Sequence, residues 1–216
     1  MDPLRLCLAL GPAAVYLLLI GAVNLSRRPL LVSGVRDGAA LGLAVSGFMI
    51  VGPIELFLPE AAAIHYEAFV WILLFALYGL CLALVLLLLR PRLIVYNISA
   101  DQVRPILAEL VEHLDDDARW AGDTLVLPRL GIQLHVDYLA AMRNVSLTSV
   151  GSRQSHAGWR HLELALRDAL GRVEVARNPR GATFVSAGVL IFATLVLAVA
   201  RDPQAVTRAL FDLLLP

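Results

Sequence analysis

Lysine is absent from this chain, and charged residues are scarce. The basic set consists of 18 arginines, balanced by 18 acidic residues, so the net charge is zero. A chain with no net charge lacks the excess of positive charge that attracts nucleic acid, and we expect no nucleic-acid partner. A basic set made only of arginine is typical of a GC-rich genome, which we take to be bacterial.

Cysteine is almost absent too. Cys7 and Cys81 lie in different apolar runs and at different expected depths, so they predict two unpaired thiols. Two cysteines in such runs supply neither a paired-cysteine zinc site nor a catalytic thiol. Phosphate-binding loops, dinucleotide fingerprints and nucleophile elbows are also missing. The sequence therefore predicts no cofactor and no metal, and favours a protein that is not an enzyme.

Long uncharged stretches account for a hydrophobic fraction of 59% against only 17% charged residues. A helix needs about 20 apolar residues to cross a hydrocarbon core of ~30 Å. Four stretches meet that length, and we predict four transmembrane helices at residues 4–25, 38–58, 69–89 and 181–200. A signal peptide is the alternative for the first, but its amino end carries acid and base together (Asp2 and Arg5), and Arg27 and Arg28 follow its carboxyl end.

Arginine placement predicts the orientation of these helices. Arginines gather in the loop after the first helix, directly after the third helix and directly before the fourth helix. Four crossings bring those segments to one face, which the positive-inside rule makes cytoplasmic. We therefore expect a multi-pass protein of the cell inner (plasma) membrane, with both termini outside.

Between the third and fourth helices, residues 91–178 predict a soluble cytoplasmic domain. A buried strand at 93–98 precedes a helix that begins at Ser99 with capping-box spacing. Short strands follow at 119–121, 124–127, 132–138 and 143–150, and an amphipathic helix at 159–172 closes the domain. The order strand, helix, three or four antiparallel strands, helix predicts a two-layer α+β fold. We expect residues 91–177 to fold by themselves.

One group of ionisable residues on the outer side is a candidate site for a proton or a divalent cation. Glu55 follows Pro53 within the second apolar run, and an acid at membrane depth is costly and often functional. The nearby residues that could join it are Glu60, His65 and Glu67. The competing interpretation, which we favour, is that Glu55 lies at headgroup level and the loop residues are solvated.

Small residues mark a packing surface on the second helix. Gly38 and Gly42 share one face, with Gly47 following, and glycines at such spacing let another helix approach closely. The neighbour is either another helix of the same chain, which we favour, or a second copy in a homo-oligomer. Residues 202–216 predict a short amphipathic helix that lies along the outer interface, and the alternative is that its apolar face packs on the helix bundle.

These features leave two hypotheses for function. The first is a non-catalytic membrane-anchored interaction or scaffold protein, with the lipid bilayer and a protein bound by the cytoplasmic domain as its partners. The alternative is a small transporter or membrane-embedded enzyme that uses the outer Glu and His residues.

Overall fold

The computed structural model describes residues 3–49, 51–52, 68–152, 154–204 and 206–207. The chain divides into two compact units. We call them the helical unit (Met1–Ile20, Gly38–Leu88 and Thr183–Pro216) and the sheet unit (Gly21–Asp37 and Leu89–Ala182). The sheet unit therefore takes residues from two separate parts of the chain.

Four helices supply the helical unit: α1 (Pro3–Leu25), α2 (Gly34–Met49), α5 (Ala68–Leu88) and α8 (Arg180–Arg201). Two of them, α1 and α8, are long and apolar enough to cross a membrane, and only 11% of each apolar window is buried. In α5 the stretch Ile72–Leu88 is a shorter apolar helix. Four crossings therefore stay a prediction.

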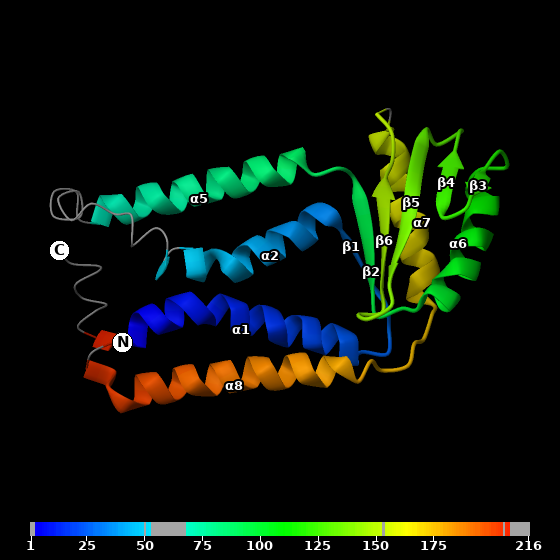
Figure 1. Ribbon diagram of the computed structural model, residues 1–216. Coiled ribbons are helices and arrows are strands. Elements are labelled where there is room, and N and C mark those ends of the chain that lie inside the picture. The colour runs from blue at the N-terminus through cyan, green and yellow to red at the C-terminus, as the bar shows by residue number, and fades with distance from the viewer. Residues whose placement is uncertain (1–2, 50, 53–67, 153, 205, 208–216) are drawn as a thin grey trace. The chain divides into compact units, whose positions relative to one another are not determined.

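Glycines bring these helices close together in the order α5, α2, α1, α8 (Figure 1). A Cβ at Gly47 of α2 would lie 2.0 Å from the backbone oxygen of Leu8 in α1. A Cβ at Gly42 would lie 2.4 Å from the side chain of Leu82 in α5. Only hydrogen at these positions permits such contacts, so both glycines face helices of their own chain, and Gly38 lies half-buried in the same helix.

The sheet unit holds a six-stranded antiparallel sheet in the order β1-β2-β6-β5-β4-β3. Its strands are β1 (Leu30–Ser33), β2 (Arg92–Tyr96), β3 (Arg119–Ala121), β4 (Thr124–Leu127), β5 (Ile132–Leu139) and β6 (Asn144–Ser149). Five of these match the predicted strands. The sixth, β1, differs from the sequence prediction, because residues 26–37 lie between two predicted membrane helices and predict a loop.

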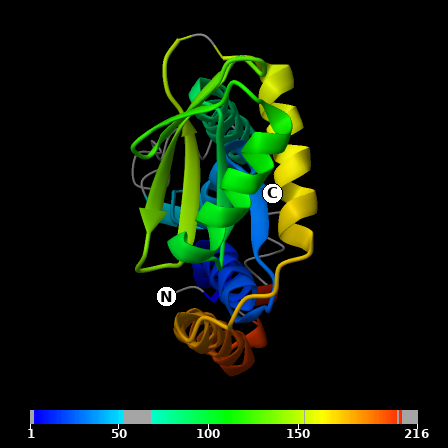
Figure 2. The ribbon, with the colours of Figure 1, turned by 90° about the vertical axis from the view of Figure 1, so that its right-hand side faces the viewer.

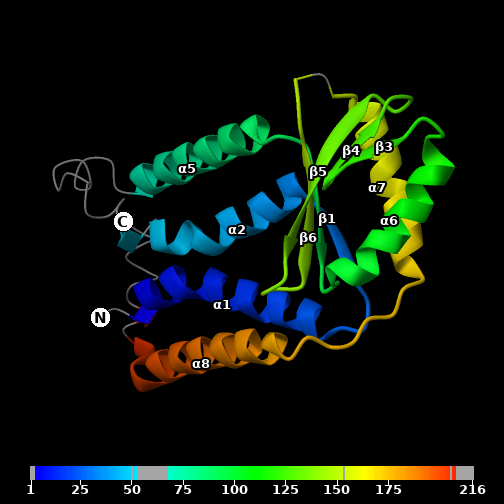
Figure 3. The same ribbon diagram turned by 45° about the vertical axis from the view of Figure 1, so that its right-hand side comes forward.

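Two amphipathic helices, α6 (Ala100–Leu114) and α7 (His156–Gly171), cover one face of the sheet (Figures 2 and 3). The apolar side chains of α6 and α7 are buried against alternate residues of the strands. Ser99 and Gln102 form the predicted capping box at the start of α6. Gly122, with a positive φ of 64°, lies in the tight turn that joins β3 and β4. The two-layer α+β fold is therefore confirmed.

Candidate functional site

The face of the sheet opposite α6 and α7 carries polar side chains. Along β5, β6 and β2 these residues alternate with the core residues and are half-buried or exposed. They include Arg92, Tyr96, Gln133, His135, Asp137, Ser146 and Thr148. A sheet with one apolar and one polar face presents the polar one for solvation or binding.

An ion pair crosses from this face to the start of α2. Arg92, at the beginning of β2, donates from Nη2 to Oδ2 of Asp37 at 3.0 Å. The Tyr96 hydroxyl, four residues along the strand, donates to the other oxygen of the same carboxylate. The Arg92 stem passes so close to Gly34 that a Cβ there would lie 2.2 Å from Cγ. Both carboxylate oxygens of Asp37 are thus occupied, and its charge is balanced.

A recess of about 450 Å³ opens beside this pair. Its lining comes from α2, β2, β5 and β6 and consists of Asp37, Arg92, Ile94, Tyr96, Asp137, Tyr138, Leu139, Asn144 and Ser146. All of these residues belong to the sheet unit. The volume is within the range of small-ligand pockets, and the lining combines hydrogen-bonding groups with apolar surface.

Asp137 supplies the exposed charge of the recess. The carboxylate of Asp137 is 60% exposed and lies 3.3 Å from Nε2 of His135, so it retains most of its contact with water. Tyr138 also lines the recess, but its side chain packs against the core, and there burial raises the pKa of the phenol, Arg104 lowers it and Asp123 raises it. The recess therefore offers one hydrated carboxylate beside hydrogen-bonding and apolar groups.

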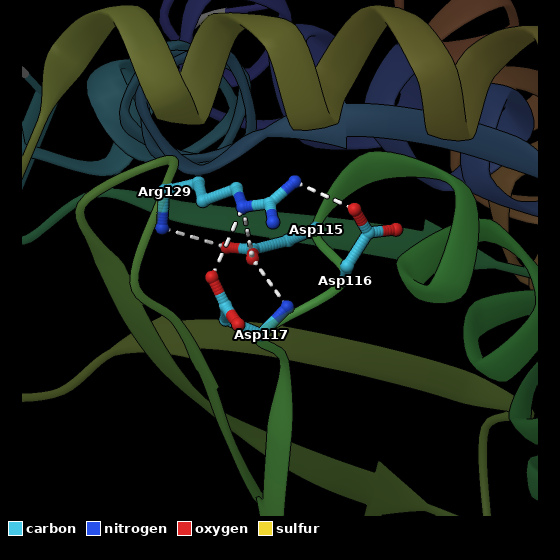
Figure 4. Close-up of polar contacts among 4 residues, drawn as sticks. All are labelled: Asp115, Asp116, Asp117 and Arg129. Atoms are coloured by element: carbon cyan, nitrogen blue, oxygen red, sulfur yellow. Dashed lines mark hydrogen bonds and ion pairs between the residues drawn. The ribbon is translucent and has the colours of Figure 1, made fainter.

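The three consecutive aspartates after α6 form a structural turn around an arginine (Figure 4). Asp115, whose side chain is fully buried, accepts hydrogen bonds from the backbone N–H groups of Asp117 and Arg129 at 3.0 and 2.8 Å. The Arg129 guanidinium contacts Asp116 at 2.6 Å and Asp117 at 3.0 Å. Hydrogen bonds to Asp117 and Asp116, then their charges, raise the pKa of Arg129 against a small desolvation effect. A guanidinium already occupies the place that a cation would take.

The candidate residues Glu55, Glu60, His65 and Glu67 lie outside the described residues. The same is true of Pro53 and of most of the tail helix predicted at 202–216. Among the described residues, no group of three or more His, Cys, Asp or Glu side chains could hold a metal ion.

Sequence reasoning missed the group formed by Asp37, Arg92 and Tyr96. Asp37 and Arg92 are 55 positions apart, and residues 93–98 predict only a buried strand. A partial signal was available in the alternation of Arg92 and Tyr96 with Leu93 and Val95. No local pattern connects that strand to Asp37.

Neither a protein-family model, nor a curated protein, nor a solved structure matches this chain.

Proposed function

We propose that this chain is a multi-pass membrane protein without catalytic activity that binds a protein partner through the polar face of its cytoplasmic sheet. The observation that carries the proposal is the recess beside Asp37 and Arg92, on the sheet face that α6 and α7 leave free. A preformed recess that combines polar groups with apolar surface is typical of a binding surface.

Charge distribution supports the cytoplasmic placement. The segments that join the apolar helices to the sheet, residues 26–37, 89–92 and 172–180, contain eight arginines and two acids. The body of the domain between them, residues 93–171, contains seven arginines and ten acids. Positive charge thus gathers next to the helix ends, where the positive-inside rule places it on the cytoplasmic side.

The chemistry of the recess favours a partner segment with a basic side chain next to an apolar one. Asp37 is neutralised by Arg92, so the available negative charge is that of Asp137. Beside it, Leu139 is 56% exposed and offers apolar surface at the rim. A buried apolar contact with a charge beside it supplies both affinity and register.

A photo-crosslinking residue placed at Leu139 tests this proposal in native membranes. We expect an adduct of defined mass, which disappears when Asp137→Arg reverses the charge of the recess. In the matched control, the photo-crosslinking residue is placed instead at Leu164, which is 54% exposed on α7. Adducts at both positions, or an adduct that survives Asp137→Arg, would contradict the proposal. An adduct of twice the chain mass would identify a second copy as the partner.

A further inference from the structure

A second recess lies in the sheet unit where the chain leaves α1 and approaches α8. It has a volume of about 480 Å³ and is lined by Arg27, Glu174, Val175, Ala176 and Arg177. The two segments that form it run side by side, because the Val175 N–H donates to the Arg27 oxygen at 2.8 Å. Arg27 and Arg177 therefore reach the same recess from different parts of the chain.

Buried polar contacts hold these segments in place. Asn178 donates from Nδ2 to Oδ1 of Asn24 at 2.9 Å, and from its backbone N–H to the Asn24 oxygen at the same distance. Both asparagines are only 3% exposed. Arg143 adds a hydrogen bond from Nη1 to the Ala176 oxygen at 2.8 Å. A buried, satisfied amide pair fixes backbone geometry, so the recess exists before any ligand arrives.

The charges of this recess favour an anion. Arg27 and Arg177 are both exposed, and neither forms an ion pair with any residue that the structure describes. Glu174 is the one acid in the lining and opposes them, which leaves a net positive charge. Two guanidinium groups can share the oxygens of one phosphate through paired hydrogen bonds.

The position of the recess along the chain indicates the source of that phosphate. Arg27 follows the last residue of α1 by two positions, and Arg177 precedes the first residue of α8 by three. Within the part of the chain that the structure describes, these are the two helices long and apolar enough to span a bilayer. Two or three residues extend at most about 7–11 Å, so both arginines stay near headgroup level if α1 and α8 are inserted.

We propose that Arg27 and Arg177 bind the phosphate of an anionic phospholipid headgroup in this recess. This inference rests on the membrane insertion proposed above. It does not depend on the partner site at the polar sheet face, because the two recesses share no residue. Glu174 weakens the binding and limits it to lipids that carry a full negative charge.

The test is an equilibrium titration of the full chain in a neutral detergent with dioctanoyl phosphatidylglycerol, and with dioctanoyl phosphatidylcholine as the uncharged counterpart. We expect Arg27→Gln with Arg177→Gln to weaken phosphatidylglycerol binding about tenfold or more. Glu174→Gln should strengthen it about two- to threefold. Binding of phosphatidylcholine should be weak and unchanged by every variant.

The matched control is Arg119→Gln with Arg160→Gln, which removes two exposed arginines elsewhere in the same unit. An equal loss in the control would overturn the inference, since it would show general charge attraction. If inorganic phosphate at an equal concentration displaces the lipid, the ligand of this recess is free phosphate and not a phospholipid headgroup. Alkaline carbonate extraction of each variant checks insertion separately. A chain that stays inserted but binds both lipids equally would overturn this inference and leave the membrane proposal intact.

Discussion

Asp37 connects the start of α2 to the sheet through its side chain. The carboxylate is 16% exposed and the Arg92 side chain 35%, so the pair is partly shielded from water. Surface ion pairs contribute little to stability, whereas a charged hydrogen bond with partial burial contributes more. Tyr96 adds a second donor to the same carboxylate. The arrangement stabilises the recess and gives Asp37 a structural role within it.

Substitution of Asp37 by Asn should therefore destabilise the sheet unit. We expect a loss of about 1–2 kcal/mol, because Arg92 keeps its charge but loses its counter-ion. Thermal unfolding of the full chain in detergent measures this loss. Asp168→Asn, which changes an exposed acid on α7, is the control and should leave the unfolding temperature unchanged. The double variant Asp37→Asn with Arg92→Gln tests the interaction. If its loss of unfolding free energy equals the sum of the two single losses, the two side chains do not interact.

At the scale of elements, β1 is a strand of only four residues with a clear part in the core. Leu31 is 8% exposed and belongs to the same core as the side chains of α6 and α7. The strand pairs with β2 along its whole length, with Leu30 opposite Tyr96 and Ser33 opposite Leu93. Without β1, β2 becomes an open edge, and open edges favour aggregation.

A fragment that contains β1 should be more stable than residues 91–177 alone. Because Ser33 pairs with Leu93, residues 26–34 can be joined to residue 91 by a short glycine-containing turn. We expect this fused fragment to unfold at a higher temperature and to stay monomeric, as measured by circular dichroism and size-exclusion chromatography. The same fusion with Leu31→Asp is its control. Identical melting of all three fragments would show that β1 adds nothing to the unit.

At the scale of the whole molecule, the charge asymmetry between helix-flanking segments and outer loops predicts the topology. Single cysteines at Ser152 and Thr207, in a chain whose Cys7 and Cys81 are replaced by alanine, report on the two sides of the membrane. We expect an impermeant maleimide to label the Thr207 position in intact cells. The Ser152 position should react only after permeabilisation. The reverse pattern would mean that the sheet unit lies outside.

The sequence alone determined the features that depend on local pattern. Long apolar runs predicted the apolar helices. Apolar residues that recur every 2.0 positions in strands and every 3.6 positions in helices predicted β2 to β6, the amphipathic helices and the two-layer fold. Each of these signals is contained in one segment of the chain. The arginine positions likewise predict an orientation in the membrane from the sequence alone, and that orientation stays a prediction.

Only the tertiary structure decided which distant segments belong together. Leu30–Ser33 joins a sheet whose other strands begin at Arg92, and Asp37 receives Arg92 and Tyr96 across more than 50 residues. Asn24 and Asn178 are 154 positions apart and still share a hydrogen bond. The physical reason is that helix and strand signals repeat along the chain, whereas a contact between distant residues depends on how both segments fold.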